Sequence, residues 1–334
     1  MQWHEVQTAD IATVGPSFIP GGGSRNGRVN AWNGMAGFGG GVYMAGVGGH
    51  SDWGGNEGYR CNLAVDTPVW EMLSEPSPTA LITRDTTHYL DGRPTSSHTY
   101  YALHGDVRRQ KIFRLGIGSA FGSGNFQKRN VDAFGISQRD WDAANTWPDA
   151  PEDIGIGRSQ AQDLATGDVY VVGATRLWRF RMESGTWTRL AAIPENGSAA
   201  YYKASAVDTR RAKFVVLGNA YKPVNGIMIY DIFTNRWSLS ILSGPAAERI
   251  STVGGACAFY NARLDKLVFK TPIAGEIILV NLETFEAQFL TTLGEKNVPN
   301  AINGVFGKFV ALPSLNGYAY LPHAQSKVWF LADS

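Results

Sequence analysis

Hydrophobic and polar residues alternate along short segments of this chain, and polar turns separate one segment from the next. Clear examples are residues 177–181 (LWRFR), 226–231 (GIMIYD) and 276–281 (EIILVN). A period of two, with β-branched and aromatic residues, indicates half-buried β-strands. No segment shows a long helical period. The pattern therefore predicts an all-β protein.

The strand-like segments form a repeat. An aromatic residue after a polar turn recurs at Trp70, Trp141, Trp187, Trp237 and Phe285. The last four are separated by roughly 40–50 residues, which is the period of propeller blades. Three strand-like segments precede most of these aromatic residues, so each unit is expected to have four strands. The second unit is longer, and we expect its glycine-rich part, residues 116–130, to be a surface loop.

The last unit lacks its aromatic strand, and residues 2–6, which include Trp3, supply one. We therefore predict a single six-bladed β-propeller domain over residues 1–334, with four-stranded antiparallel blades. The N-terminal strand would complete the last blade and so remove two exposed sheet edges. The expected blades are residues 30–73, 96–145, 158–190, 202–240, 252–290 and 302–332. An irregular β-sandwich is the alternative.

Composition agrees with many short strands and tight turns, because 12% of the residues are aromatic, 39 are glycine and only 18% are charged. The formal net charge is +1 and the basic residues are scattered, so no nucleic-acid partner is expected. Cys61 and Cys257 lie within expected strands, without metal-ligand spacing, and are expected to be buried free thiols. We expect no metal and no cofactor.

The first residues lack the basic and apolar regions of a signal peptide. No run approaches the roughly 20 apolar residues of a membrane span. We therefore expect no membrane insertion, and a location either in a virion or in the cytoplasm.

A glycine pair, a strand, a short turn and a tryptophan follow one another in the first unit, at Gly48-Gly49, Asn62-Leu63 and Trp70. This order resembles the kelch repeat of kelch-like and galactose-oxidase-type β-propellers. Residues 48–100, with their His, Tyr and Arg side chains, are also similar to propeller-type polysaccharide lyases. Such propellers include copper oxidases, lyases, glycan binders and protein-interaction modules, so the resemblance implies the fold and leaves the function open.

Polar residues are expected to converge where the innermost strands begin, at one face of the channel. Amide, aromatic and basic side chains there suit sugar hydroxyls. The candidate ligand-binding residues are Asn33, Gln160, Tyr202, Lys203 and Asn303, with His50 and Asp52 from the glycine-rich corner. The alternative is structural: such side chains also pair with neighbouring blades, or with the backbone of their own turn.

A catalytic interpretation rests on His98, Tyr100 and Arg158. In a lyase, Tyr or His would abstract a proton and Arg would neutralise the adjacent uronate. This set is incomplete, so the predicted function is a non-catalytic structural or recognition module. A phage virion or tail is the suggested setting, and a host-surface glycan or other virion proteins are the suggested partners. A homo-oligomer also fits. The alternative is a polysaccharide lyase that cleaves uronate-containing glycan by β-elimination.

Overall fold

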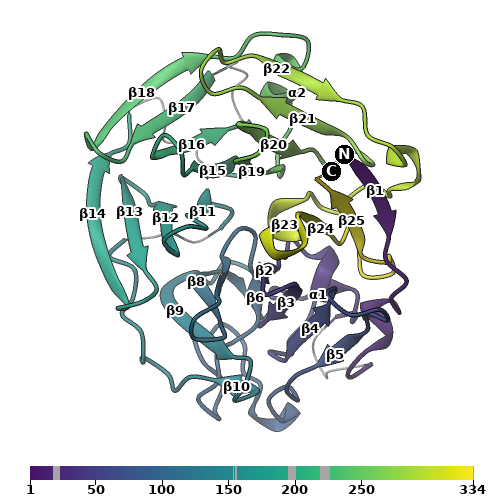
Figure 1. Ribbon diagram of the computed structural model, residues 1–334. Helices are drawn as coiled ribbons and strands as arrows, with labels where there is room; N and C mark the ends of the chain where they lie inside the picture. The colour runs from purple at the N-terminus through teal and green to yellow at the C-terminus, as the bar shows by residue number, and fades with distance from the viewer. Residues whose placement is uncertain (18–22, 153, 155, 195–200, 219–225, 334) are drawn as a thin grey trace.

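The computed structural model describes residues 1–17, 23–152, 154, 156–194, 201–218 and 226–333. Six antiparallel sheets are arranged in a ring, as Figure 1 shows. The predicted all-β class and the six-bladed propeller are therefore confirmed. No helix in the described part of the chain has the length and apolar character to cross a membrane.

Each blade runs from an innermost to an outermost strand. Blade 1 contains β2 (Ala36–Phe38), β3 (Gly41–Ala45), β4 (Gly58–Asn62) and β5 (Trp70–Met72), and blade 2 contains β6 (Ser97–His98), β7 (Leu103–Asp106), β8 (Lys111–Ala120), β9 (Lys128–Gly135) and β10 (Asp140–Trp141). Blade 3 contains β11 (Gln160–Gln162), β12 (Asp168–Val172), β13 (Arg176–Arg181) and β14 (Thr186–Ala192), and blade 4 contains β15 (Ala204–Asp208), β16 (Lys213–Leu217), β17 (Gly226–Asp231) and β18 (Arg236–Ile241). Blade 5 contains β19 (Cys257–Asn261), β20 (Lys266–Lys270), β21 (Ile277–Val280) and β22 (Ala287–Leu290), and blade 6 contains β23 (Phe309–Leu312), β24 (Gly317–Tyr320), β25 (Trp329–Ala332) and β1 (Gln2–Glu5).

The short helices lie between these strands. They are η1 (Ile11–Thr13), α1 (Gly27–Asn30), η2 (Thr79–Leu81), α2 (Ala247–Thr252), η4 (Glu295–Asn297), η5 (Phe306–Lys308) and η6 (Pro313–Leu315).

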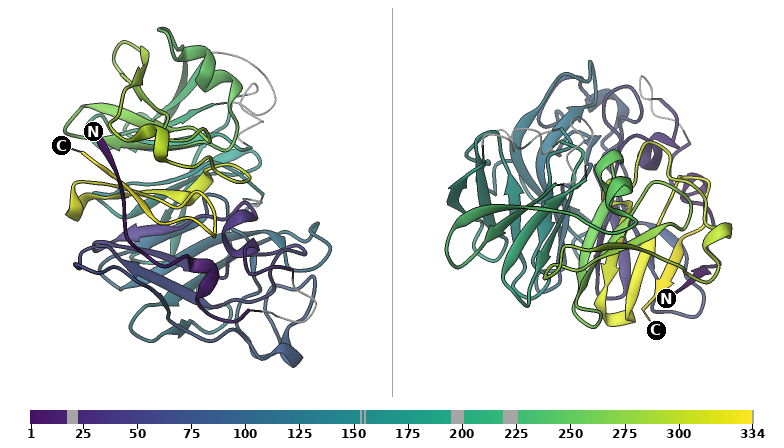
Figure 2. Two further views of the ribbon diagram at one scale, coloured as in Figure 1. Left: turned by 90° about the vertical axis from the view of Figure 1, so that its right-hand side faces the viewer. Right: turned by 90° about the horizontal axis from the view of Figure 1, so that it is seen from above.

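The two ends of the chain close the ring, as the sequence predicts. Strand β1 pairs antiparallel with β25, and Trp3 is opposite Leu331. The Trp3 side chain is 4% exposed, packs against Phe309 and Tyr320, and donates a hydrogen bond to the Gly275 carbonyl of blade 5 at 3.1 Å. Figures 1 and 2 show both termini side by side at this blade.

An acidic or amide side chain fixes the turn that follows several innermost strands. Asp106, Asp163 and Asp208 each accept hydrogen bonds from the backbone amides two and three residues later, and Asn261 accepts one from Leu264. Such side-chain contacts replace the backbone partners that a turn leaves unsatisfied. These turns lie at the face opposite the loops that lead into the innermost strands.

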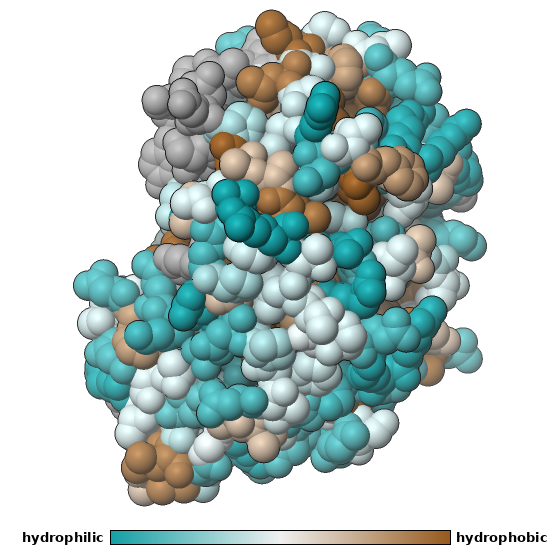
Figure 3. All heavy atoms as spheres, turned by 90° about the vertical axis from the view of Figure 1, so that its left-hand side faces the viewer, coloured by the Kyte–Doolittle hydropathy of each residue, from teal (hydrophilic) through white to brown (hydrophobic). Residues whose placement is uncertain are grey.

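Apolar side chains fill the spaces between neighbouring blades. One cluster joins Val215 and Leu217 of blade 4 with Leu267, Phe269 and Ile278 of blade 5. At the outer rim, by contrast, Phe233, Leu239 and Ile241 are exposed. In Figure 3, hydrophobic residues on this side of the molecule are dispersed among hydrophilic ones. The core therefore lies between the sheets, around the channel.

Blade 2 departs from the regular unit and corrects one expectation. Residues 116–130 were expected to form a surface loop, yet β8 continues to Ala120 and β9 begins at Lys128. The extended part of β8 pairs with β6, which comes before the innermost strand β7. This extra pairing holds the hairpin in an extended form above the blade, where periodic glycines in the sequence indicated a loop.

Candidate functional site

A pocket of about 600 Å³ lies at the face where the innermost strands begin. We call it the upper pocket. Its residues come from the segments that lead into the innermost strands and from the β3–β4 and β8–β9 loops. Blades 1 to 6 therefore contribute to one site through loops that are far apart in sequence.

Aromatic residues form the floor of the upper pocket. Trp32, Tyr100, Tyr202 and Phe306, which we call the aromatic floor, each come shortly before an innermost strand. Their φ angles are 53°, 46°, 57° and 45°, in the left-handed region that bulky residues seldom adopt. Strain of this kind persists where the surrounding structure enforces it, and it clusters at functional sites.

Backbone hydrogen bonds between blades enforce this conformation. The Tyr100 amide donates to the Trp32 carbonyl at 2.9 Å, and the Gly255 amide donates to the Tyr202 carbonyl at 2.8 Å. The ring centroid of Tyr100 is 5.8 Å from that of Tyr202 and 5.2 Å from that of Phe306. The floor is thus a packed aromatic surface that the scaffold holds in place.

Histidines stand beside the floor. The Nε2 atom of His98 lies 2.9 Å from an Asp52 carboxylate oxygen, and its Nδ1 atom lies 3.5 Å from the Tyr100 hydroxyl. His98 is 5% exposed, and its ring lies 5.1 Å from that of Trp32. His50 is exposed, and its ring meets His98 edge-on at 6.2 Å. His50 is therefore the more accessible of the two histidines.

The glycine-rich corner of blade 1 positions these histidines. It crosses to blade 2, where the His50 amide donates to the carbonyls of Ser119 and Ala120. Gly49 has φ +77°, and a Cβ there would lie 2.3 Å from the Ser119 oxygen and 2.5 Å from the His98 nitrogen. Only glycine allows this approach, and it brings Asp52 within reach of His98.

Gly49→Ala is expected to destabilise the fold by more than about 1 kcal/mol and to weaken binding in the upper pocket. The added methyl group would collide with backbone atoms that cannot move independently. Gly92→Ala is the matched control, because Gly92 has φ +81° and open space at its Cβ. Urea unfolding gives the free energy of unfolding of both variants. The loss in Gly92→Ala reports the cost of a positive φ alone, and any additional loss in Gly49→Ala reports the steric conflict. Equal losses would contradict the close-approach argument.

The elongated hairpin of blade 2 supplies the outer wall. Ser119, Ser123, Gly124 and Asn125 line the pocket from β8 and the β8–β9 loop. A Cβ at Gly124 would lie 2.3 Å from the His50 ring, so this loop packs directly over the imidazole. Small residues with hydroxyl and amide groups therefore line this side of the pocket.

The lining of the pocket carries no Asp, Glu, Lys or Arg among the described residues. Burial is the main reason that the pKa of the Tyr100 phenol is raised above its ordinary value, so this group stays protonated at neutral pH. No cluster of His, Cys, Asp and Glu in the described ranges could hold a metal ion. The arrangement offers neutral hydrogen-bonding groups beside an aromatic surface.

The structure brings half of the sequence-predicted site residues together. His50, His98, Tyr100, Tyr202 and Asn303 line the upper pocket, and Asp52 adjoins it through His98. Sequence reasoning missed Trp32, Phe306 and the hairpin residues. A signal was present for the first two, since an aromatic residue comes shortly before four of the innermost strands.

The remaining candidates lie elsewhere. Asn33 is fully buried and bonds to Gly27 and Thr99, and Lys203 lies outside the upper-pocket lining. Burial lowers the pKa of Lys203. Gln160 faces the channel below the floor, where it pairs with His104.

Arg158 also lies outside the lining of the upper pocket. Its guanidinium donates to the Gly173 carbonyl and to the Tyr201 hydroxyl, each at 2.9 Å, and lies over the Tyr201 ring. His98 and Tyr100 thus meet each other without the cation that the sequence placed beside them.

Comparisons with known proteins support the fold alone. No protein-family model matches this chain, and no curated protein sequence matches it. A solved structure entitled "Structure of YjhT" is similar, with a TM-score of 0.56 and 13% sequence identity. The likeness covers 90% of this chain and 93% of that one. Together with the blade topology, this similarity shows that the chain is a β-propeller.

Proposed function

We propose that this propeller is a non-catalytic recognition module that binds a neutral sugar unit of a glycan in the upper pocket. The aromatic floor, held in left-handed backbone conformations beside a wall of neutral polar groups, is the observation that carries the proposal. A sugar ring has apolar C–H faces and hydroxyl edges. It therefore fits an aromatic surface flanked by hydrogen-bonding side chains.

The wall has suitable partners for those hydroxyls. His50 and Asn125 present an imidazole and an amide, which can both donate and accept. The Ser123 hydroxyl donates to the Asp85 carboxylate at 2.9 Å, so towards a sugar it can act only as an acceptor. Asn303 stands at the rim, and its amide donates to the Asn30 carbonyl at 2.7 Å, which fixes its orientation. Because the lining is uncharged in the described residues, neutral sugars are favoured over uronates.

A polysaccharide lyase is the second candidate, and the contact of His98 with both Asp52 and Tyr100 favours it. Two features weigh against it. The Tyr100 phenol has a raised pKa, which makes it a poor base at neutral pH, and Arg158 is engaged with Gly173 and Tyr201. The suggested virion setting, with a glycan or other virion proteins as partner, stays a proposal.

Tyr202→Ala is expected to weaken glycan binding by at least about tenfold, which corresponds to about 1.4 kcal/mol. The variant removes part of the aromatic floor and leaves the charge of the pocket unchanged. A glycan array identifies a binding sugar, and calorimetry then measures its affinity for each variant. Tyr260→Ala is the matched control, because Tyr260 is a half-buried tyrosine at the opposite face.

Two results would overturn the proposal. One is a glycan affinity that Tyr202→Ala leaves unchanged, or that Tyr260→Ala lowers as much as Tyr202→Ala does. The other is the appearance of unsaturated, ultraviolet-absorbing product from a uronate polysaccharide that disappears in His98→Ala, which would establish the lyase instead.

A further inference from the structure

The central channel contains a second cavity, of about 460 Å³, below the aromatic floor. It is lined by the innermost strands and opens among the turns that follow them, near Leu164, Arg263 and Asn316. These turns lie at the face opposite the upper pocket. The volume is within the range of roughly 300–1,000 Å³ that small-molecule sites occupy.

Aromatic rings separate this channel cavity from the upper pocket. Tyr100 lines the upper pocket and its neighbour Tyr101 lines the channel cavity. The Phe306 ring contacts both, at 5.2 and 5.3 Å between centroids, and the Tyr101 hydroxyl donates to the Ala256 carbonyl at 2.8 Å. The channel cavity is therefore closed at its inner end.

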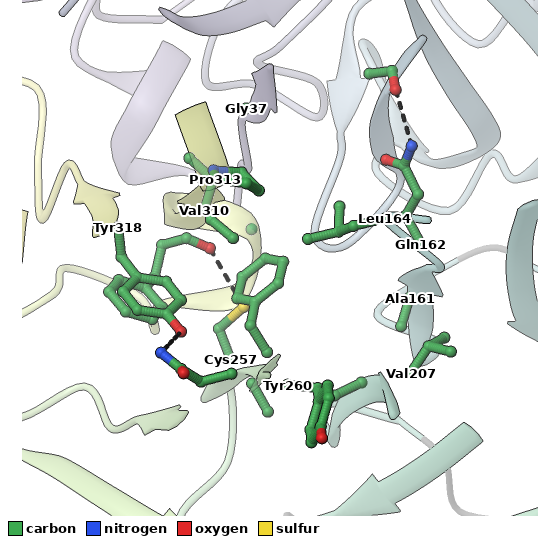
Figure 4. A pocket seen from close by; sticks show the side chains of 18 of the residues that line it. Gly37, Ala161, Gln162, Leu164, Val207, Cys257, Tyr260, Val310, Pro313 and Tyr318 are labelled. Carbon is green, nitrogen blue, oxygen red and sulfur yellow. Dashed lines mark hydrogen bonds between the residues drawn. The ribbon is translucent and has the colours of Figure 1, made fainter. Parts of the chain in front are cut away.

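The walls of the channel cavity are mainly apolar. Leu103, Val207, Phe259 and Val310 contribute from four different blades. Leu164 stands at the mouth with 41% of its surface exposed, and Figure 4 shows Leu164 and Val310 pointing into the cavity. A ligand that removes this apolar surface from water lowers the free energy of the system, which favours binding.

The charged groups at the mouth are already paired. Arg263 contacts Asp333 at 2.5 Å, and the Asn261 amide donates to Asp333 and to the Tyr318 hydroxyl. Farther in, burial lowers the pKa of His104 to about 4, so its imidazole is neutral at pH 7. The cavity therefore offers no unpaired charge among its described lining residues, and this favours a neutral ligand.

One polar group remains for a ligand. The Gln162 amide nitrogen donates to the Gly105 carbonyl at 2.8 Å, and Figure 4 shows this bond at the cavity wall. The Gln162 carbonyl oxygen has no partner among the described residues, so it can accept a hydrogen bond. In contrast, both polar groups of the Gln160 side chain already have partners. Its carbonyl oxygen hydrogen-bonds to His104, and its amide nitrogen donates to the Leu115 carbonyl.

From these features we infer a second binding site in the channel, for a neutral and mainly apolar small molecule that carries one hydrogen-bond donor. The apolar body would fill the space between Val207, Phe259 and Val310, and the donor would meet Gln162. The site is independent of glycan binding in the upper pocket.

The neutral fluorophore N-phenyl-1-naphthylamine tests this inference, because it has an apolar body and one N–H group and its emission rises in apolar surroundings. Leu164→Asp is expected to weaken its binding by about tenfold, since a carboxylate would replace apolar surface at the mouth. Phe233→Asp is the matched control, because Phe233 is 85% exposed on the outer rim. It should bind the probe as the unaltered protein does. Thermal unfolding would verify that both variants fold.

Gln162→Met tests the hydrogen bond separately. It should weaken binding of N-phenyl-1-naphthylamine and leave binding of 1-phenylnaphthalene, which lacks the N–H group, unchanged. Tyr202→Ala should leave the affinity for both probes unaltered, because it changes only the upper pocket. The inference is overturned if the unaltered protein does not bind the probe, if Phe233→Asp loses as much affinity as Leu164→Asp, or if Gln162→Met affects both probes equally.

Discussion

Replacing Trp3 with alanine is expected to lower the free energy of unfolding by about 3–5 kcal/mol, the usual cost of deleting a large buried aromatic side chain. Trp3 is almost fully buried among Phe309, Tyr320 and Gly275, and its strand is the only covering of the β25 edge among the described residues. Denaturation in urea measures the loss. Hydrogen exchange should also show reduced protection of the β25 amides.

Trp237→Ala is the control for this experiment. Trp237 is half-buried on the outermost strand of blade 4, where it packs against Phe214 and Tyr230, but it does not join the two ends of the chain. Its loss should cost less and should leave β25 protected. If Trp3→Ala leaves β25 fully protected, or costs no more than Trp237→Ala, the ring does not depend on this closure.

Breaking the buried ion pair in blade 2 is expected to have an effect of similar size. Arg114 is fully buried and bonds to Asp132 at 2.8 Å, and the same carboxylate contacts His88 at 3.1 Å. Arg114 also donates to the carbonyls of Gly46 and Thr95, so it ties the glycine-rich corner to blade 2. Removing one partner leaves an uncompensated buried charge, which typically costs about 3–5 kcal/mol.

Arg114→Met and Asp132→Asn should therefore each destabilise the fold, while the double variant should cost less than the sum of the two. Residues in one network show such non-additivity. Urea unfolding of the three variants gives the coupling energy. Simple additivity would mean that the pair contributes nothing beyond its separate contacts.

The same pair predicts how stability depends on pH. Burial alone would raise the pKa of Asp132, but the charge of Arg114 and the hydrogen bonds from His88 and Arg114 lower it overall. The contribution of Asp132 is therefore complete above its unfolded pKa of about 3.8 and is lost as the pH falls through the lower native pKa. Asp132→Asn should flatten this acid limb of the stability curve.

The architecture could be predicted because its causes are local and repeated. Alternating strands, polar turns and an aromatic residue at a constant interval define each blade, and the unpaired last unit required a strand from the N-terminus. The extended hairpin of blade 2 could not be predicted, because β6 holds β8 through a pairing that no single segment encodes. Glycines at 116, 118, 122 and 124 indicated a loop there.

The site was predictable only in part, for a related reason. His98, Tyr100 and Tyr202 follow from their places ahead of the innermost strands. Asn33 and Arg158 occupy equivalent places in the sequence, but their polar groups hydrogen-bond to other parts of the protein and do not line the pocket. Their partners lie far along the chain or in another blade. Which side chain faces the pocket depends on the left-handed backbone of the floor, and this conformation leaves no periodic signal.

The pairing of β1 with β25 also dictates an order of events during synthesis. Residues 2–5 leave the ribosome before residues 329–332, with blades 1 to 5 between them, so the sixth blade cannot form until the other five have emerged. Contacts between residues this far apart in sequence make folding slow. Blades 1 to 5 can assemble earlier, but their ring stays open, with free edges that favour association between chains. Nascent chains are therefore most prone to aggregate just before the ring closes.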